Sequence, residues 1–276
     1  MFRLRFGLFG SEEVITSSFP DGTLHLKVDK NCSEFHTIEW YYESDAELFT
    51  LICLRRQLSD NKLSLIMPYI PHARMDRVKS PTDVFTLKYF AEVINSLNFE
   101  EVFVLDAHSN VSLALIDRVG QIDENVFLRT YVKRAAADAG IKAEDVILFF
   151  PDEGAMKRYS DKFELPYAFG IKKRDWATGE IKGLQLMNEE LVKDATVLII
   201  DDICSRGGTF YHSAKALRAA GAKDIYLYVS HAEKTMLEGD MYKSDLVKKI
   251  YTTDSLFKKD MDYLDKVVVM PITDAI

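Results

Sequence analysis

Residues 195–222 read "ATVLIIDDICSRGGTFYHSAKALRAAGA", and their pattern indicates the fold class of the whole chain. The stretch opens with a run of apolar and β-branched residues, as in a strand that is buried on both faces. A Gly-Gly turn follows at residues 207–208, and the remainder has the spacing of an amphipathic helix that Gly221 can end. The stretch therefore predicts a strand, a turn and a helix, which is the repeating unit of a parallel α/β sheet.

Similar units recur along the chain. Strand-like runs within residues 63–76, 101–109, 145–163 and 224–234 each end in polar residues, and the pattern of residues 82–97 predicts a helix. In parallel α/β sheets, ligands bind beyond the carboxyl ends of the strands. The polar residues expected at those ends are Arg74, Asp76, Asp106, His108, Asp152, Asp201, Asp202 and His231.

A single sheet would have to contain more strands than one layer of an α/β fold usually holds. We therefore predict two α/β domains, each with a mainly parallel sheet flanked by helices. The first would comprise residues 1–127 together with a returning C-terminal segment, 266–276, and the second would comprise residues 128–265.

Composition narrows the class of protein. The chain is 47% hydrophobic and 28% charged, with a formal net charge of −8. This charge argues against nucleic acid or an anionic membrane as the partner. No run approaches the ~20 apolar residues that span a bilayer, and the N-terminus lacks the pattern of a secretory signal. Three widely separated cysteines suggest reduced thiols, so we expect a cytoplasmic protein.

The chemistry of the 195–222 stretch favours a ribose-phosphate ligand. One aspartate after a strand could simply cap the next helix, but this explains a second adjacent aspartate poorly. Ionised carboxylates accept hydrogen bonds from sugar hydroxyls, and a glycine turn at a helix N-terminus binds phosphate. The residues predicted to bind the ribose phosphate are Asp201, Asp202, Ser205, Arg206, Gly207, Gly208 and Thr209.

At family level, "VLIIDDICSRGGTF" (197–210) resembles the phosphoribosyl-pyrophosphate loop of type I phosphoribosyltransferases and of ribose-phosphate pyrophosphokinases. Further stretches resemble the pyrophosphokinases and follow their order along most of the chain. They are "FPDGTLHLKV" (19–28), "PYIPHARMDR" (68–77), "LDAHS" (105–109), "FPDEGAMKR" (150–158) and "IKKRDWATGEIKG" (171–183). The chain thus resembles a divergent ribose-phosphate pyrophosphokinase, and the resemblance implies two phosphoribosyltransferase-like domains.

The resemblance implies an ATP-dependent diphosphotransferase that uses Mg²⁺. It assigns ATP binding to Phe19, Asp21, Arg74, Asp76 and His108, and the metal to His108 and Asp152. It assigns catalysis to Lys172 and Arg174 on a loop that closes over the phosphates. Because residues like Phe19 and Asp21 often act from a neighbouring subunit in this family, the resemblance also implies a homodimer or a higher homo-oligomer.

The residues alone leave plainer interpretations open. Phe19 could be a core aromatic, and Arg74 could pair with Asp76 rather than with phosphate. His108 could be structural, and Lys172 and Arg174 could be solvated charges on a hairpin.

Departures from the family pattern fall on the predicted ribose-phosphate loop, residues 201–209, which we call the acceptor loop. In this loop Ser205 replaces an acid and Arg206 replaces a small threonine. Met75, Thr23 and Ala155 also differ from the usual residues. Two acceptors remain open: ribose 5-phosphate, giving PRPP and AMP, or ADP-ribose, as in a divergent phage-type branch that serves NAD rebuilding. A type I phosphoribosyltransferase and a catalytically silent regulatory subunit are the more distant alternatives, and regulation stays open.

Overall fold

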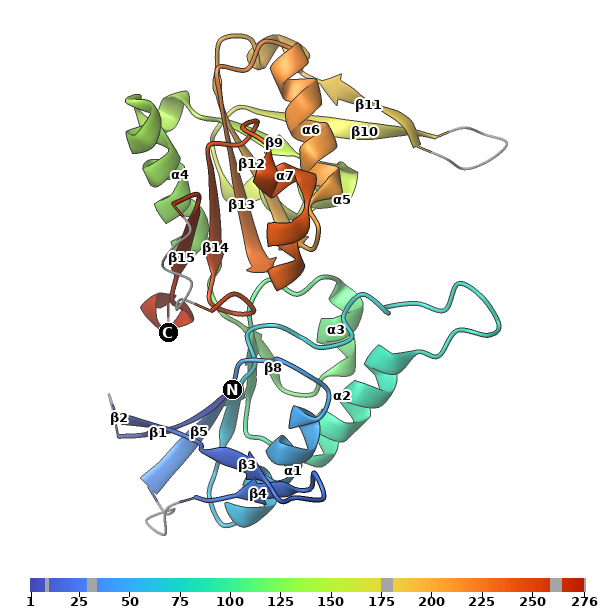
Figure 1. Cartoon of the computed structure of the whole chain (residues 1–276), viewed down its shortest axis with the longest axis vertical. Coiled ribbons are helices and arrows are strands. Elements are labelled where there is room, and N and C mark those ends of the chain that lie inside the picture. The colour runs from blue at the N-terminus through green and yellow to red at the C-terminus, as the bar shows by residue number, and fades with distance from the viewer. Residues whose placement is uncertain (8–9, 29–33, 175–180, 259–264, 276) are drawn as a thin grey trace. The chain divides into compact units, whose positions relative to one another are not determined.

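The computed structural model describes residues 1–7, 10–28, 34–174, 181–258 and 265–275, with only the backbone given for 172–174 and 181–183. The chain divides into two compact units, Met1–Ile122 and Asp123–Ile276 (Figure 1). The first unit ends just before helix α4 (Asn125–Ala139). This end lies close to residue 127, where the sequence predicts the end of the first domain.

The sheet of the first unit has the strand order β2-β1-β5-β6-β7-β8. Its strands are β1 (Phe2–Phe6), β2 (Gly10–Glu13), β5 (Phe35–Trp40), β6 (Ser64–Ile66), β7 (Val102–Val104) and β8 (Val119–Gln121). Strands β5 to β8 are parallel neighbours, and β1 pairs antiparallel with β2 and β5. Strands β3 (Thr16–Ser18) and β4 (Leu24–Leu26) form a separate antiparallel hairpin.

Three helices of the first unit connect its strands: α1 (Glu47–Gln57), α2 (Thr86–Ser96) and α3 (Asn110–Leu115). Leu51 of α1 and Phe90 of α2 are buried in one apolar cluster with Leu65 of β6. The helix predicted over 82–97 begins later than expected, at Thr86, because Asp83 uses its carboxylate to accept from the N–H groups of Lys79 and Ser80.

The sheet of the second unit has the order β11-β10-β9-β12-β13-β14-β15. Its strands are β9 (Ile147–Phe150), β10 (Tyr167–Arg174), β11 (Ile181–Met187), β12 (Thr196–Cys204), β13 (Asp224–Ala232), β14 (Lys249–Thr253) and β15 (Val267–Met270). All neighbouring pairs are parallel except β10 and β11. The predicted α/β class with mainly parallel sheets is therefore confirmed in both units.

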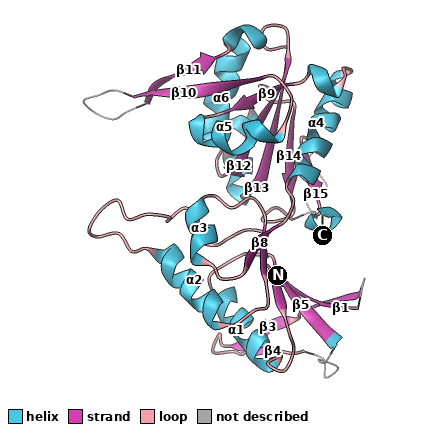
Figure 2. Cartoon of the chain, turned by 180° about the vertical axis from the view of Figure 1, so that it is seen from behind, coloured by secondary structure: helices cyan, strands magenta, loops and turns pink. Residues whose placement is uncertain are grey.

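Helices cover both faces of the second sheet. Val197 and Ile199 of β12 share an apolar cluster with Leu217 of α6 (Gly208–Ala219). On the other face, Tyr131 of α4 stacks on Tyr251 with ring centroids 4.9 Å apart. Figures 1 and 2 show α4 and α6 on opposite sides of these strands. Burial on both faces explains why β12 reads as a continuous apolar run.

The C-terminal segment does not return to the first unit as expected. Strand β15 pairs in parallel with β14, in the register Ile250↔Val267 to Thr253↔Met270, so it extends the second sheet. Lys266 reinforces this placement, because its ammonium donates to the carbonyl oxygens of Tyr242 and Ser244 at 2.8 and 2.5 Å. The run "KVVVM" is thus an edge strand of the second unit.

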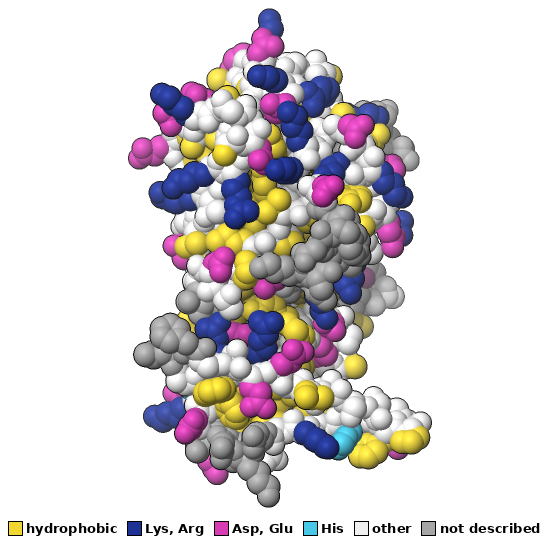
Figure 3. All heavy atoms as spheres, turned by 60° about the vertical axis from the view of Figure 1, so that its left-hand side comes forward, with side chains coloured by type: hydrophobic (Ala, Val, Ile, Leu, Met, Phe, Trp, Pro, Cys, Tyr) yellow, Lys and Arg dark blue, Asp and Glu magenta, His cyan; other side chains and the backbone are white. Residues whose placement is uncertain are grey.

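The surface is consistent with the modest negative charge of the chain. On the face shown in Figure 3, basic and acidic side chains are intermixed rather than gathered by sign. No helix in the described part of the chain is long and apolar enough to cross a membrane.

Candidate active site

The carboxyl edge of the second sheet brings together three predicted aspartates. Strands β9 and β12 are parallel neighbours, with Leu148 opposite Leu198. Asp152 follows β9 after Pro151, and Asp201 and Asp202 lie near the end of β12. The two aspartates belong to the strand, which continues to Cys204 because β13 pairs with it through Ala232. The sequence predicts both aspartates at the end of the strand, whereas the strand continues past them to Cys204.

Asp152 is fixed by the helix that follows it. Its Oδ1 accepts from the N–H groups of Gly154 and Ala155 at 3.0 and 3.1 Å, capping α5 (Glu153–Tyr159). A Cβ at Gly154 would lie 3.1 Å from the same oxygen, which is a tight contact. Of the two small residues in "DEGA", the first is therefore the one with little room for a side chain, while Ala155 fits in its place.

The two aspartates of β12 are not equivalent. Asp202 is only 4% exposed, and its Oδ2 lies 3.1 Å from Nη1 of Arg158 on α5. Asp201 is more exposed, and its Oδ1 accepts from the N–H of Asp202 at 3.0 Å. Of the pair, Asp201 is the carboxylate that a sugar could reach.

Electrostatics distinguish Asp201 further. Burial raises the pKa of Asp201 well above its usual range, and the negative charges of Asp202 and then Asp152 raise it as well. The hydrogen bond from the N–H of Asp202 offsets only part of this rise. The edge therefore favours either a proton or an incoming cation or hydroxyl donor beside Asp201.

The turn after β12 presents the start of α6. Gly207 is the N-cap residue in a left-handed conformation (φ +74°), and a Cβ there would lie 3.0–3.1 Å from Met241. Glycine is thus required both by the backbone angle and by the available space. The first turn of α6 directs backbone N–H groups away from the helix, which suits a phosphate.

The two unusual residues of the loop contact the segment after β13. The hydroxyl of Ser205 donates to Oε2 of Glu233 at 2.7 Å. Nη2 of Arg206 pairs with Oε2 of Glu238 at 3.3 Å, and both of these side chains are exposed. Arg206 thus has a carboxylate partner in this structure, at the edge of the predicted phosphate site.

In the first unit, the ends of β6 and β7 are adjacent. The N–H of Leu105 donates to the carbonyl oxygen of Pro68 at 2.9 Å, which joins the start of "PYIPHARMDR" to "LDAHS". His108 is partly buried, and the exposed Arg74 lies further along the loop after β6. The structure thus places these predicted residues on loops that leave neighbouring parallel strands.

Asp76 pairs with the residue that follows it in the chain. Its Oδ1 lies 3.0 Å from Nε of Arg77, so the ion pair seen here joins adjacent residues. Asp106 is almost fully buried, with a positive φ of 42°. A positive φ is uncommon outside glycine, so the backbone turns sharply just before His108.

Phe19 and Asp21 lie at the tip of the β3–β4 hairpin. Phe19 is 51% exposed, and its ring centroid is 4.9 Å from that of His25. The carboxylate of Asp21 accepts from the N–H and hydroxyl of Thr23, and these hydrogen bonds lower the pKa of Asp21. An aromatic exposed to this degree is no core residue, so its face is available for stacking.

The expected catalytic pair lies largely outside the described residues. The backbones of Lys172 and Arg174 belong to β10, where they pair with Leu184 and Ile181 of β11. Their side chains and residues 175–180 are not described.

The donors present suit a loosely held Mg²⁺. Mg²⁺ prefers oxygen ligands, keeps several waters and commonly arrives on substrate phosphates. Across the described ranges, no three His, Cys, Asp or Glu side chains form a closed metal cluster. Burial and then the negative charges of Asp202 and Asp152 raise the pKa of Asp201, and a cation beside this carboxylate would offset the repulsion.

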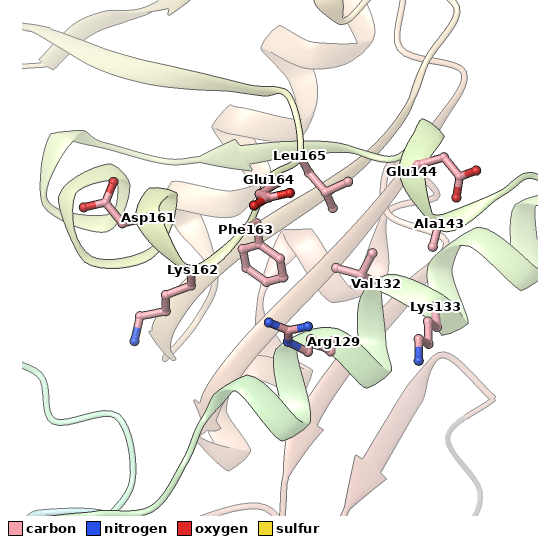
Figure 4. A pocket seen from close by; sticks show the side chains of 10 residues that line it. All are labelled: Arg129, Val132, Lys133, Ala143, Glu144, Asp161, Lys162, Phe163, Glu164 and Leu165. Atoms are coloured by element: carbon pink, nitrogen blue, oxygen red, sulfur yellow. The ribbon is translucent and has the colours of Figure 1, made fainter.

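A hollow of about 570 Å³ lies elsewhere in the second unit (Figure 4). Its lining comes from α4, from residues 143–144 and from residues 161–165, with Phe163 between Arg129 and Leu165. It contains no predicted site residue. Strand ends rather than this hollow therefore define the candidate site.

Sequence reasoning missed the partners of the predicted residues. Arg158 is the last residue of the quoted "FPDEGAMKR" stretch, but its pairing with Asp202 is not apparent from the sequence. Glu233 and Glu238 were not considered, because nothing in the loop motif points to residues about 30 positions later. Only the adjacency of β12 and β13 brings them together.

Known proteins resemble the chain at the level of family and fold. The phosphoribosyl transferase domain model matches residues 144–266, which lie in the second unit. Curated ribose-phosphate pyrophosphokinases are similar over a longer range. The Clostridium tetani protein is 25% identical, covering 82% of this chain and 70% of its own length. The Sulfurisphaera tokodaii protein is 24% identical, covering 94% and 88%.

A solved structure extends the fold similarity to both units. The phosphoribosylpyrophosphate synthetase from Mycobacterium smegmatis superposes with a TM-score of 0.76, covering 95% of this chain and 87% of its own, at 19% identity. At this identity the likeness concerns the fold. It agrees with two α/β units in one chain.

Proposed function

We propose that this chain, a divergent member of the ribose-phosphate pyrophosphokinase family, transfers the diphosphoryl group of ATP to the anomeric hydroxyl of ribose 5-phosphate. The products are PRPP and AMP. The observation that carries the proposal is the carboxyl edge of the second sheet, where the partly exposed Asp201, near the end of β12, precedes the glycine turn and the N-terminus of α6. The carboxylate that can accept hydrogen bonds from sugar hydroxyls is thus followed along the chain by N–H groups that can donate to a phosphate. This is the order that a sugar phosphate needs.

The second unit would hold the acceptor. Asp201 accepts hydrogen bonds from ring hydroxyls, while the first N–H groups of α6 and the turn at Gly207 bind the 5-phosphate. Arg158 holds Asp202 behind them, which keeps the local negative charge from rising further. The anomeric oxygen then forms a bond to the β-phosphorus of ATP, the bond to the α–β bridging oxygen breaks, AMP leaves with that electron pair, and the hydroxyl proton passes to solvent.

The first unit would supply the nucleotide contacts. Phe19 stacks on the adenine with Asp21 beside it, and Arg74, with Asp76 nearby, faces the ATP phosphates. The exposure of Phe19 and of Arg74 supports these roles. Lys172 and Arg174 would stabilise the charge that develops on the transferred group, as cationic side chains do in phosphoryl transfer.

His108 and Asp152 would hold Mg²⁺ together with the ATP phosphates. When bound, the ion neutralises charge on the transferred diphosphoryl group. A homodimer or higher homo-oligomer and a cytoplasmic location stay predictions.

ADP-ribose remains the alternative acceptor. The guanidinium of Arg206 is exposed beside the phosphate-binding turn, where it could meet a second phosphate if its pair with Glu238 opens. A phosphoribosyltransferase activity would give no role to the first unit, over which the pyrophosphokinase similarity continues.

Product analysis with Mg·ATP tests the proposal. Ribose 5-phosphate and ADP-ribose are offered in separate reactions, and AMP is measured. AMP release that depends on ribose 5-phosphate is expected. Release only with ADP-ribose would replace the acceptor, and no acceptor-dependent release would reject the diphosphotransferase.

A further inference from the structure

Ser205 has a fixed hydrogen-bond direction because of its neighbour. Its Oγ lies 2.7 Å from Oε2 of Glu233, and Oγ1 of Thr235 lies 3.2 Å from the same oxygen. An ionised carboxylate can only accept, so both hydroxyl hydrogens point at Glu233. The hydroxyl oxygens of Ser205 and Thr235 are 3.4 Å apart, which is longer than the contact that either of them makes with Glu233.

A serine whose hydrogen is committed presents only lone pairs to other groups. Ser205 therefore becomes a hydrogen-bond acceptor, although a serine hydroxyl is ordinarily free to donate. It lies in the turn between Asp201 and the N-terminus of α6, where the proposed acceptor sugar binds. A carboxylate at position 205 would also have been an acceptor, so Glu233 gives this serine one property of the acid that the loop lacks.

The arrangement is held in place by backbone contacts. The N–H of Glu233 donates to the carbonyl oxygen of Cys204 at 2.8 Å, continuing the pairing of β12 with β13. A Cβ at Gly239 would lie only 1.8 Å from the carbonyl oxygen of Arg206, so the chain after η5 (Lys234–Glu238) runs against the loop. The loop and residues 233–239 thus contact each other at both ends, with Glu233 in a defined position.

We propose that Glu233 is a positioning residue that orients Ser205 to accept a hydrogen bond from a hydroxyl of the acceptor sugar. This inference rests on the proposed function, since it assumes a ribose phosphate in the loop. Glu233 acts through Ser205 and raises affinity for the acceptor.

A double-mutant cycle tests the inference. Dissociation constants for ribose 5-phosphate are measured by titration calorimetry without ATP, for the wild type, Glu233→Gln, Ser205→Ala and the double variant. Gln can donate to Ser205 and release its hydrogen, so Glu233→Gln should weaken binding about tenfold. In the Ser205→Ala background the same change should have no further effect. Glu190→Gln, an exposed site on η4 (Glu189–Leu191), is the matched control.

Two results would overturn the inference: unchanged binding in Glu233→Gln, or an equal further loss in the Ser205→Ala background. If Glu233→Gln proves unstable in thermal unfolding, Ser205→Asp/Glu233→Gln decides, because the carboxylate at 205 should restore binding and failure to do so would reject the role.

The cycle also separates the two proposals. Binding that follows the expected pattern without AMP release would reject the proposed reaction alone. AMP release with ribose 5-phosphate and no dependence of binding on Glu233 would reject the inference alone. A wild type that fails to bind ribose 5-phosphate would reject both.

Discussion

Arg158 of α5 and Asp202 of β12 form an ion pair across the carboxyl edge of the second sheet, with Nη1 and Oδ2 3.1 Å apart. Asp202 is almost fully buried. Removing one partner of a buried pair leaves a desolvated charge behind, which costs more than an exposed pair can contribute. The pair therefore stabilises the edge on which the acceptor loop is built.

Replacing Arg158 with Met should lower the free energy of unfolding by about 2 kcal/mol, because the arginine is partly exposed and the cost is below that of a fully buried pair. Thermal unfolding measures the change. Lys157→Met, the exposed neighbour on the same helix, should alter stability by less than about 0.5 kcal/mol. Equal effects of the two substitutions would show that the pair has no special role.

Asp201→Asn should stabilise the protein while weakening the acceptor site. The amide keeps the oxygen that accepts from the N–H of Asp202, but it removes a charge that burial disfavours and that Asp202 and Asp152 repel. Since the native pKa of Asp201 lies above the unfolded value, the wild type loses stability as pH rises from about 4 through the native pKa.

The melting temperature of Asp201→Asn should therefore exceed that of the wild type by about 3 °C at neutral pH. The gap should close as pH falls toward the ordinary aspartate value. A difference in melting temperature that is constant from pH 4 to pH 8 would mean that the pKa of Asp201 is not raised in the folded protein.

Gly207→Ala and Gly208→Ala form a matched pair of substitutions. A side chain at Gly207 meets both a left-handed backbone and Met241, so stability should fall by about 1–2 kcal/mol. At Gly208, the first residue of α6, a Cβ meets nothing within 4 Å. Chemical denaturation should show no loss there. A comparable loss at Gly208 would contradict the geometry of the turn.

Phe19→Ala should raise KM for ATP about tenfold, because stacking of a base on an aromatic ring is worth ~1–3 kcal/mol. The melting temperature should not change, since the ring is about half exposed. Tyr89→Ala on α2 removes another exposed aromatic and is the control. Steady-state kinetics in which both variants match the wild type would remove Phe19 from the nucleotide site.

The sequence predicted the strand–turn–helix units well, because the periodicity of β12 and α6 reflects local burial. It predicted less well the features that depend on which strands pair with each other, such as the end of a strand or the sheet that a strand joins. Strand β12 runs through both aspartates because β13 extends beside it to Ala232, and β15 joins β14 rather than the first sheet. Such choices depend on contacts between distant segments, which a single sequence does not encode locally.

In the candidate site, too, some residues could be predicted from local sequence patterns and others depend on contacts between distant segments. Asp152, Asp201 and Gly207 could be found from motifs, since each lies at or shortly after the carboxyl end of a strand that the sequence predicts. Glu233 could not, because its role depends on a hydroxyl 28 positions earlier in the chain that only the β12–β13 pairing brings within 2.7 Å. Motifs identify the groups that could meet a ligand, while packing determines how those groups are oriented.

Phosphorus NMR of a reaction containing Mg·ATP and ribose 5-phosphate identifies the group that is transferred. AMP and a new diphosphate ester at the anomeric carbon should form in equal amounts, because attack falls on the β-phosphorus. Formation of ADP with a singly phosphorylated sugar, or of AMP without the diphosphate ester, would contradict the proposed diphosphoryl transfer.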